Sequence, residues 1–364
     1  LVAQAFRAVR TSSHNLESLY HRKLLITLMS GPPKIKEATM RTRDRMLPVG
    51  WYPASVSACK AEIENFILGT TPLPPGTSVY GGIVPHAGWH FSGKAAVRVF
   101  FLTSKAAQPQ VVCVFGGHLG GNSPPLLVAD DAWETPLGAL TLATEFYAPL
   151  AKRLPLREEY PGDNTIEVQL PLVKYFFPQA KLLALRAPHS NTATELGQAV
   201  AAVAKGLKVS ILVFGSTDLT HYGPNYGFAP KGYGPEAVKW VKEVNDKKFI
   251  DQALKLDGPG MLKAAQADQS ACSAGGAVAA VAAAKANGAR KAALIDYYTS
   301  YDVMPNDSFV GYAGMVLEGP DRFAPPETTS AQGVFLPMTD YLELPDVLAV
   351  TRVGRYTALS QVTT

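Results

Sequence analysis

Three histidines stand in similar places, each after a segment rich in β-forming residues and inside a turn that contains glycine or proline. They are His86 in VPHAG, His118 in FGGHLG and His221 in FGSTDLTHYG. Imidazole is a common ligand for iron, copper and zinc, and it also transfers protons near neutral pH. A lone turn histidine more often bonds to nearby backbone, but three in matching positions favour one shared site.

Cys272 could join such a site. It directly precedes a helix that we predict over residues 273–287, and the positive end of a helix favours the thiolate, which is the form that binds metal. The small residues 271 and 274–276 leave room for a ligand to approach. The alternative is a small buried residue that fills space among alanines.

Asp218 and His221 share one turn at a spacing of three residues, so both side chains can face the same cavity. An aspartate can fix the tautomer of a histidine or bind a metal itself, while the histidine transfers a proton. Asp218 could equally cap a helical turn over residues 219–222, and the two functions are compatible.

The elements that would position these residues alternate along the chain. Segments rich in β-forming residues, separated mostly by helical stretches, occur at residues 78–84, 111–115, 181–185, 209–214, 292–297 and 309–316. This alternation predicts an α/β fold: a three-layer αβα arrangement with a largely parallel or mixed central sheet. Because the carboxyl ends of parallel strands face one crevice, His86, His118 and His221 can converge there despite their separation in sequence.

Several helix ends are also predicted. Asn164 and Thr192 each have a glutamate three residues later, which is the capping-box pattern. Pro171 is expected to kink the helix that starts at Asn164. Gly288 fits the left-handed residue that ends the helix over 273–287.

The chain divides into three parts by composition. Residues 1–46 form a basic N-terminal extension with nine basic and three acidic residues, 47–318 form the α/β domain, and 319–364 form a proline- and threonine-containing C-terminal arm. Residues 47–364 carry 25 basic and 27 acidic residues, so they lack the dense positive charge that binds nucleic acid. No apolar stretch is long enough to span a membrane. We therefore expect neither nucleic acid nor a membrane as a partner.

The cysteines and the terminal parts bear on location and assembly. Three widely separated cysteines argue against a disulfide framework and for a reducing compartment, so we expect a cytoplasmic protein. The N-terminal extension contains arginines and few acids, a feature shared with organelle-targeting segments. Its histidines, His14 and His21, are given no role. The extension and the C-terminal arm could join copies of the chain into a homo-oligomer, which leaves an assembly-forming structural role as a further alternative function.

Longer segments of the chain resemble those of one family. PHAGWHFSG at residues 85–93 is similar to the Memo-family segment PHAGYxYSG, and STDLTHYG at 216–223 matches another. Further matches are WETPLG at 133–138, IEVQLP at 166–171, YTSYD at 298–302 and VGY at 310–312. They run in order from about residue 49 to residue 317. The chain thus resembles the Memo family, whose prokaryotic members include protein B of the AmmeMemoRadiSam system.

The resemblance implies a fold like that of class III extradiol dioxygenases, which use non-haem Fe(II). By that likeness His86 and His118 would bind the metal, and Cys272 would take the position of the dioxygenases' carboxylate ligand. His221 would be the catalytic acid/base, with Asp218 lining the same pocket. The metal would be Fe(II) or copper, and a thiolate in place of a carboxylate also makes zinc a candidate.

Two functions follow from the resemblance. The first is a metal-dependent, dioxygenase-like oxidoreductase of unknown substrate. The second is a non-catalytic binding module whose pocket holds a peptide, such as a phosphotyrosine peptide, or a small anionic ligand. The sequence shows no arginine cluster that would recognise phosphate, which counts against the second function.

The chain departs from the family pattern near the expected site. Asp163 and Asn164 stand where the family usually has Glu-His, so one supporting imidazole is missing, and the turn that holds His118 is a residue shorter than the usual Gly-Pro-x-His form. His189 follows another strand and could line the same rim, although a capping or surface position is our expectation. His90 could support the ligands from behind.

Overall fold

The computed structural model describes residues 40–160 and 162–320. Most of the N-terminal extension, including His14 and His21, and the C-terminal arm from residue 321 onward lie outside the described residues. Within the described ranges, no helix is both long and apolar enough to cross a membrane.

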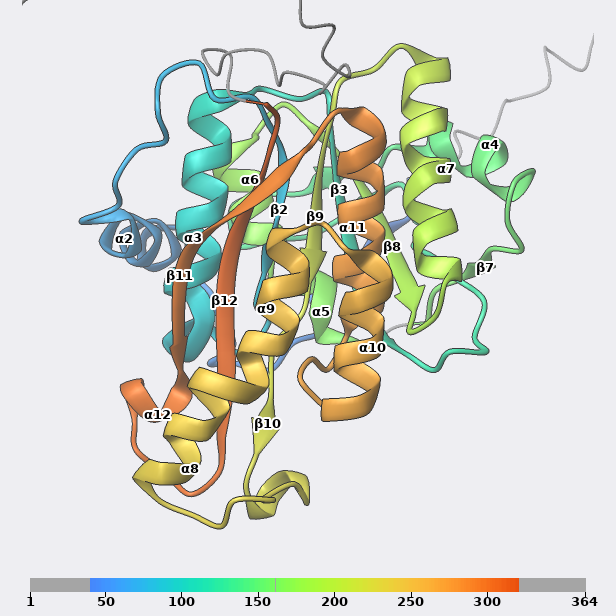
Figure 1. The fold of residues 1–364 in the computed structure, drawn as a ribbon. Helices are drawn as coiled ribbons and strands as arrows, with labels where there is room; N and C mark the ends of the chain where they lie inside the picture. Colours follow the sequence, from blue (N-terminus) through green and yellow to red (C-terminus); the bar gives the residue numbers. More distant parts are fainter. Residues whose placement is uncertain (1–39, 161, 321–364) are drawn as a thin grey trace, which may run out of the picture. The chain divides into compact units, whose positions relative to one another are not determined.

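Nine strands form one mixed sheet (Figure 1). Its centre consists of four parallel strands in the order β2-β9-β3-β8. Their bounds are β2 Val79–Val84, β9 Ile211–Ser216, β3 Val111–Leu119 and β8 Lys181–Pro188. Antiparallel strands extend the β2 edge: β12 Phe309–Glu318, β11 Lys291–Thr299 and β10 His221–Tyr222. Beyond β8 lie β4 Leu126–Leu127 and β7 Arg157–Glu158.

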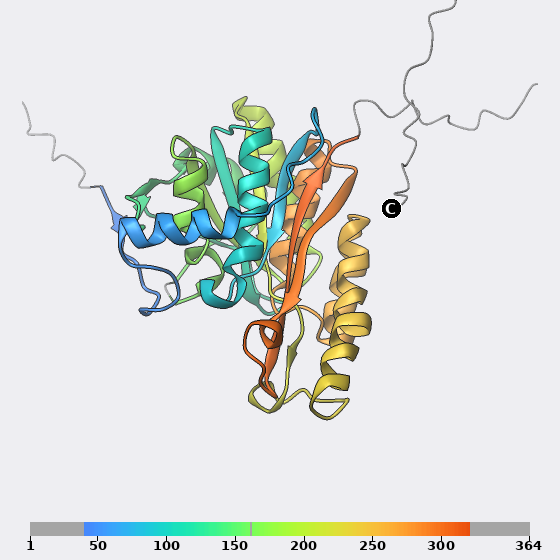
Figure 2. The same ribbon diagram turned by 90° about the vertical axis from the view of Figure 1, so that its left-hand side faces the viewer.

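Helices cover both faces of this sheet (Figures 1 and 2). One layer contains α2 Val56–Ile67, α3 Trp89–Ala106 and α6 Leu170–Phe176. The opposite layer contains α7 Thr192–Leu207, α9 Asp246–Leu254, α10 Gly258–Asp268 and α11 Ala274–Asn287. Successive side chains of a strand point to opposite faces, so Val112 and Val114 belong to the core under α3 whereas Val111 and Cys113 belong to the core under α11. The predicted three-layer αβα fold is confirmed.

Smaller elements complete the described part. A three-stranded sheet contains β1 Thr42–Arg43, β5 Ala132–Trp133 and β6 Leu140–Thr141. The helical elements are η1 Thr144–Phe146, α4 Tyr147–Ala151, α5 Asn164–Glu167, η2 Pro224–Tyr226, α8 Pro235–Trp240, the π-turn η3 Val241–Asn245 and α12 Ser300–Val303. Because β1 pairs with β5, the last residues of the N-terminal extension contact the domain.

The predicted capping box at Asn164 is wrong. Asp163 caps α5 by accepting a hydrogen bond from the backbone N–H of Thr165. Glu167 instead accepts hydrogen bonds from the backbone N–H groups of residues 46 and 47, which have no helical partner. Pro171 stands in the first turn of a separate helix, α6, where its missing N–H costs no hydrogen bond, rather than kinking one continuous helix.

The prediction for the start of α7 is wrong, and the prediction for the end of α11 is correct. No side-chain cap is present at the start of α7, where Asn191 precedes Thr192, so the second predicted capping box is also wrong. Gly288 ends α11 with a φ of +123°, a conformation that glycine adopts more readily than other residues, as predicted.

Candidate metal centre

His86 follows β2 and is held firmly. Its side chain is only 2% exposed, and Ser216 Oγ, at the end of β9, lies 3.1 Å from His86 Nδ1. The backbone N–H of His86 donates to Asp218 Oδ1 at 2.6 Å, and Asn164 Nδ2 donates to its carbonyl oxygen at 3.0 Å. Both the ring and the backbone of His86 are therefore fixed by residues from two neighbouring turns.

His118 lies near the end of β3, where the register with β8 is irregular. It adopts a left-handed conformation with φ of +57°, which is uncommon for a residue with a side chain. Gly117 makes this path feasible, because a Cβ there would lie 2.1 Å from the Ser273 side chain. His118 Nδ1 donates to Asp163 Oδ2 at 3.0 Å. The shorter turn noted in the sequence therefore still directs His118 to the cluster, with its ring centroid 5.0 Å from that of His86.

Cys272 precedes α11, as predicted. Its Sγ lies 3.2 Å from His86 Nε2, and its backbone N–H donates to the carbonyl oxygen of Asp218 at 3.2 Å. The glycines after it have a different purpose from the one expected. A Cβ on Gly275 would lie 2.3 Å from the Pro188 carbonyl oxygen, so the missing side chains let α11 pack closely against the strand ends.

Asp218 and His221 occupy the turn after β9. Asp218 is 3% exposed, and its Oδ2 lies 3.8 Å from His86 Nε2 and 4.0 Å from His221 Nε2. The alternative in which Asp218 caps a helical turn is wrong, because Leu219 forms a bridge with Ala271 and His221 begins β10. Asp218 instead accepts the backbone hydrogen bond of His86.

The structure brings all five candidate residues together. The donor atoms of His86, His118 and Cys272 lie within 4.8 Å of one another, and so do those of Asp218, His221 and Cys272. The sulfur of Cys272 is common to both groups. The convergence expected from the strand ends is therefore observed, although the side chains come from positions as far apart as 86 and 272.

The electrostatics of the cluster favour a thiolate. Burial raises the pKa of Cys272, but the nearby His86, His118 and His221 outweigh burial and hold that pKa well below its usual value. Burial lowers the pKa of His118, whereas its hydrogen bonds with Asp163 and Cys272 raise it by more, to about 10. The thiolate is the form of cysteine that binds metal ions.

A cavity of about 470 Å³ opens over the cluster. Its wall includes His86, His118, Asp218 and His221. The rest of the wall is mixed: it contains the polar residues Asn164, Asn225, Asn306, Ser300 and Ser308, the aromatic residues Trp51, Phe91, Tyr226 and Tyr312, and Ala87, Gly88, Met304 and Val310. Such a cavity suits a polar ligand with an aromatic or apolar part.

The sequence did not reveal how His118 is supported. Asp163 lies between His118 and Arg186, whose Nη2 is 3.2 Å from Asp163 Oδ2. The only sequence signal was the departure from the family pattern at residues 163–164, which we interpreted as the loss of an imidazole. Asp163 in fact holds a ring nitrogen of His118, and Asn164 binds the backbone of His86.

The two other histidines lie outside the cluster. His90 is exposed on α3 and packs its ring against Phe91, with ring centroids 4.8 Å apart, so it does not support the ligands as suggested. His189 is only partly exposed and lines a second cavity next to Cys272, rather than taking the capping or surface position that we expected.

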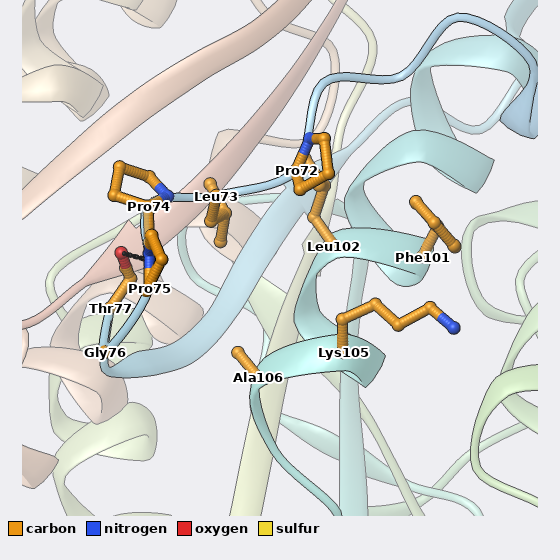
Figure 3. A pocket seen from close by; sticks show the side chains of 10 residues that line it. All are labelled: Pro72, Leu73, Pro74, Pro75, Gly76, Thr77, Phe101, Leu102, Lys105 and Ala106. Carbon is orange, nitrogen blue, oxygen red and sulfur yellow. Dashed lines mark hydrogen bonds between the residues drawn. The ribbon is translucent and has the colours of Figure 1, made fainter.

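A separate cavity of about 510 Å³ lies at the C-terminal end of α3, away from the histidine and cysteine cluster (Figure 3). Prolines of the loop at residues 72–77 face the last turns of α3 there, and Lys105 is its one charged lining residue. It offers neither histidine nor cysteine among its lining residues. The five residues expected to carry chemistry lie instead at the carboxyl edge of the sheet.

The fold and the site define a class: three-layer α/β proteins with two imidazoles and a thiolate gathered at the carboxyl edge of the sheet. The family model described as Memo-like protein matches residues 46–316. A MEMO1 family protein of Methanopyrus kandleri is 32% identical over 284 residues, which cover 73% of this chain and 95% of that protein. One of Thermococcus onnurineus is 31% identical over 66% of this chain and 87% of its own length. This chain belongs to the Memo family.

A solved structure is also similar, at a greater distance. It is that of an uncharacterized protein from Escherichia coli K12, with a TM-score of 0.38 and 15% sequence identity over 59% of this chain and 89% of that one. At this distance the similarity adds nothing to the description of the site.

Proposed function

We propose that this chain binds one iron or copper ion through His86, His118 and Cys272, and that the centre performs dioxygenase-like redox chemistry. The observation that carries the proposal is the convergence of these three donor atoms within 4.8 Å. Donors bound to one ion at about 2.0–2.3 Å lie about 3–4 Å apart. The observed separations therefore require only small side-chain movements.

The donor set also fits such an ion chemically. Two imidazoles and a thiolate suit iron, copper or zinc, and three protein donors leave coordination positions open. When bound, iron or copper would supply the capacity to transfer electrons and polarise a ligand. Asp163 fixes the orientation of His118, and Ser216 does the same for His86, which is how supporting residues usually hold metal-binding imidazoles.

Asp218 and His221 are proposed as the catalytic pair. Both line the cavity of about 470 Å³ over the cluster, and His221 Nε2 is 4.0 Å from Asp218 Oδ2. The imidazole of His221 can accept a proton from a ligand in the cavity and return it later, while Asp218, beside its Nε2, stabilises the protonated ring. Burial raises the pKa of Asp218, and the adjacent imidazoles oppose that rise.

A second candidate function is non-catalytic binding of a peptide or a small anionic ligand. The asparagine and serine side chains around the cavity favour it, because they provide hydrogen bonds to a polar ligand. The lining contains no lysine or arginine, so a phosphate group would find only neutral donors and imidazoles there. Titrating a phosphotyrosine peptide into metal-free protein separates the two functions: tight binding without metal would favour the binding module.

Elemental analysis of anaerobically purified protein tests the metal proposal. We expect iron or copper near one ion per chain, and at least a hundredfold lower metal affinity in His86→Ala, His118→Ala and Cys272→Ala. His90→Ala and Cys59→Ala are matched controls, because His90 is exposed on α3 and Cys59 is a buried residue of α2, outside the cluster. Wild-type metal content in all three site variants would refute the assignment.

Assembly and location remain part of the proposal. We expect residues 1–46 and 319–364 to mediate homo-oligomer formation, which light scattering on a chain that ends at residue 320 would test for the C-terminal arm; an unchanged mass would exclude it. The three cysteines are free and far apart, which supports a reducing compartment such as the cytoplasm.

A further inference from the structure

A second cavity, of about 400 Å³, reaches Cys272 from the side of α10. It is lined by His189, Leu219, His221, Tyr226, Ala265, Gln269, Ala271 and Cys272. His221 and Tyr226 also line the first cavity, the one of about 470 Å³ over the cluster, and their ring centroids are 4.8 Å apart. These two rings therefore form a partition, with His86 and His118 facing one cavity and Cys272 facing the other.

His189 gives this second cavity a polar group without a protein partner. Its backbone N–H donates to the Leu119 carbonyl oxygen at 3.1 Å, which fixes the residue directly after β8. Its Nε2 is buried and has no hydrogen-bond partner within the described part of the chain. Buried polar atoms nearly always have a partner, so this nitrogen beside the cavity is a candidate hydrogen-bond donor to a molecule bound there.

The lining also indicates what kind of molecule fits. It contains no lysine, arginine, aspartate or glutamate. Its hydrogen-bonding groups are two imidazoles, the Gln269 amide and the Tyr226 hydroxyl, and alanine and leucine side chains make up most of the rest. A wall of this kind suits a small neutral molecule that accepts a hydrogen bond, because apart from the Cys272 sulfur it offers an ion no carboxylate, lysine or arginine to replace its lost hydration.

We propose that this second cavity is a separate entrance by which a small neutral molecule reaches the sulfur of Cys272, with His189 donating a hydrogen bond to that molecule. The small molecule could then reach the Cys272 sulfur through the second cavity even while a larger ligand occupies the first cavity. This inference goes beyond the proposed function, because it needs no bound metal.

Alkylation by iodoacetamide tests the entrance directly. The reagent is small, neutral and carries a carbonyl acceptor; the Cys272 sulfur forms a bond to its methylene carbon, and iodide leaves. The full chain is first freed of metal by a chelator, so the result does not depend on the metal proposal. Cys59 and Cys113 are 0% exposed and serve as internal controls of folding, since peptide mapping should find them unlabelled.

Two matched variants compare the entrances. Gln269 and Met304 are both exposed, one on the second cavity and the other on the first. We expect Gln269→Trp to slow alkylation of Cys272 at least tenfold and Met304→Trp to change it less than twofold. Ala265→Phe, which fills the second cavity from α10, provides a second test by the same route.

The outcomes are distinct. The proposal is overturned if Met304→Trp slows the reaction while Gln269→Trp and Ala265→Phe do not, or if none of the three slows it. His189→Leu tests the hydrogen bond: we expect a fall of about fivefold, and an unchanged rate would remove His189 from the proposal. Failure of any of these tests leaves the metal-content experiment unaffected.

Discussion

The two sides of the cluster are held in different ways. Behind His118 runs a chain of ion pairs: Asp163 contacts Arg186, Arg186 lies 3.5 Å from Glu159, and Glu159 pairs with Arg43 of β1. Behind His221 there are buried hydrogen bonds instead. Asp246 accepts from the backbone N–H and the hydroxyl of Thr220, the residue before His221.

The second support depends on an irregular helix. Asn245 ends the π-turn η3 and donates from Nδ2 to Thr220 Oγ1 at 2.9 Å, and Tyr297 donates its hydroxyl to Asp246 Oδ2 at 2.9 Å. The donors to Asp246 are thus uncharged, and burial raises its pKa to about 6. For Asp163, burial acts in the same direction, but the hydrogen bonds from His118 and Thr165 and the charge of Arg186 lower its pKa overall. Charge therefore supports one side of the cluster, and neutral hydrogen bonds support the other.

The largest expected effect comes from breaking the ionic support. Arg186 is 3% exposed, and Arg186→Met would leave two buried carboxylates, Glu159 and Asp163, without this shared cation. Removing one member of a buried ion pair typically costs about 3–5 kcal/mol of unfolding free energy. Urea unfolding followed by circular dichroism measures it. A loss below 1 kcal/mol would show that the ionic chain adds little to stability.

The hydrogen-bonded support should respond to pH. Asp246 has an unfolded pKa near 3.8 and a folded pKa of about 6, so the folded state retains its proton where the unfolded state has lost it. Its contribution to stability is fully present below pH 3.8 and is lost as the pH rises to 6, by about 3 kcal/mol at most. An asparagine side chain at this position can still accept the bonds from Thr220, and it does not titrate. We therefore expect the unfolding free energy of Asp246→Asn to rise relative to that of the wild type between pH 4 and 6, and parallel pH profiles would contradict this.

The two supports also show where sequence analysis succeeded and where it stopped. The six longer strands and the convergence of His86, His118 and His221 were predictable, because apolar segments and the turns after them are local features and parallel strands share one carboxyl edge. The place of Cys272 beside them was implied by the resemblance to the family. Asp163 and Asp246 were not identified as supports. Asp163 lies 45 residues from its partner His118, and Asp246 lies 26 residues from its partner Thr220. No local sequence pattern specifies pairings over such separations.

The failed capping box at Asn164 has the same origin. Glu167 could have bonded within its own helix, but the backbone N–H groups of residues 46 and 47 needed an acceptor and lie beside it in the fold. A local pattern competes with contacts from distant segments, and here the distant contact prevails. The glycines after Cys272 are a similar case, because close packing on the strand ends explains them.

If the proposed metal centre is correct, metal affinity should also distinguish the ion pairs behind His118 from the hydrogen bonds behind His221, with a smaller effect. Asp163→Asn removes the negative charge that holds His118 Nδ1, and loss of such a partner typically weakens metal binding 10–100-fold. Asp246→Asn keeps the bonds to Thr220 and lies farther from the donors, so we expect a change below threefold. Competition with a chelator of known affinity measures both. Equal losses in the two variants would remove the distinction between the supports.

The smallest effect is expected where each support reaches the surface. Arg41 pairs with Asp130 and Glu158 at 2.8 Å, and its side chain is 55% exposed; Lys247 pairs with Asp251 beside Asp246 and is 59% exposed. Solvent and salt screen such pairs, and Asp130 keeps its contact with Arg43 when Arg41 is removed. Arg41→Ala and Lys247→Ala should therefore leave the thermal unfolding midpoint and the metal affinity indistinguishable from those of the wild type. If Arg41→Ala alone lowered the midpoint, the ion pairs that support His118 would contribute to stability as far as the surface. The two sides of the cluster would then differ in how far their supporting contacts extend, rather than in whether those contacts carry buried charge.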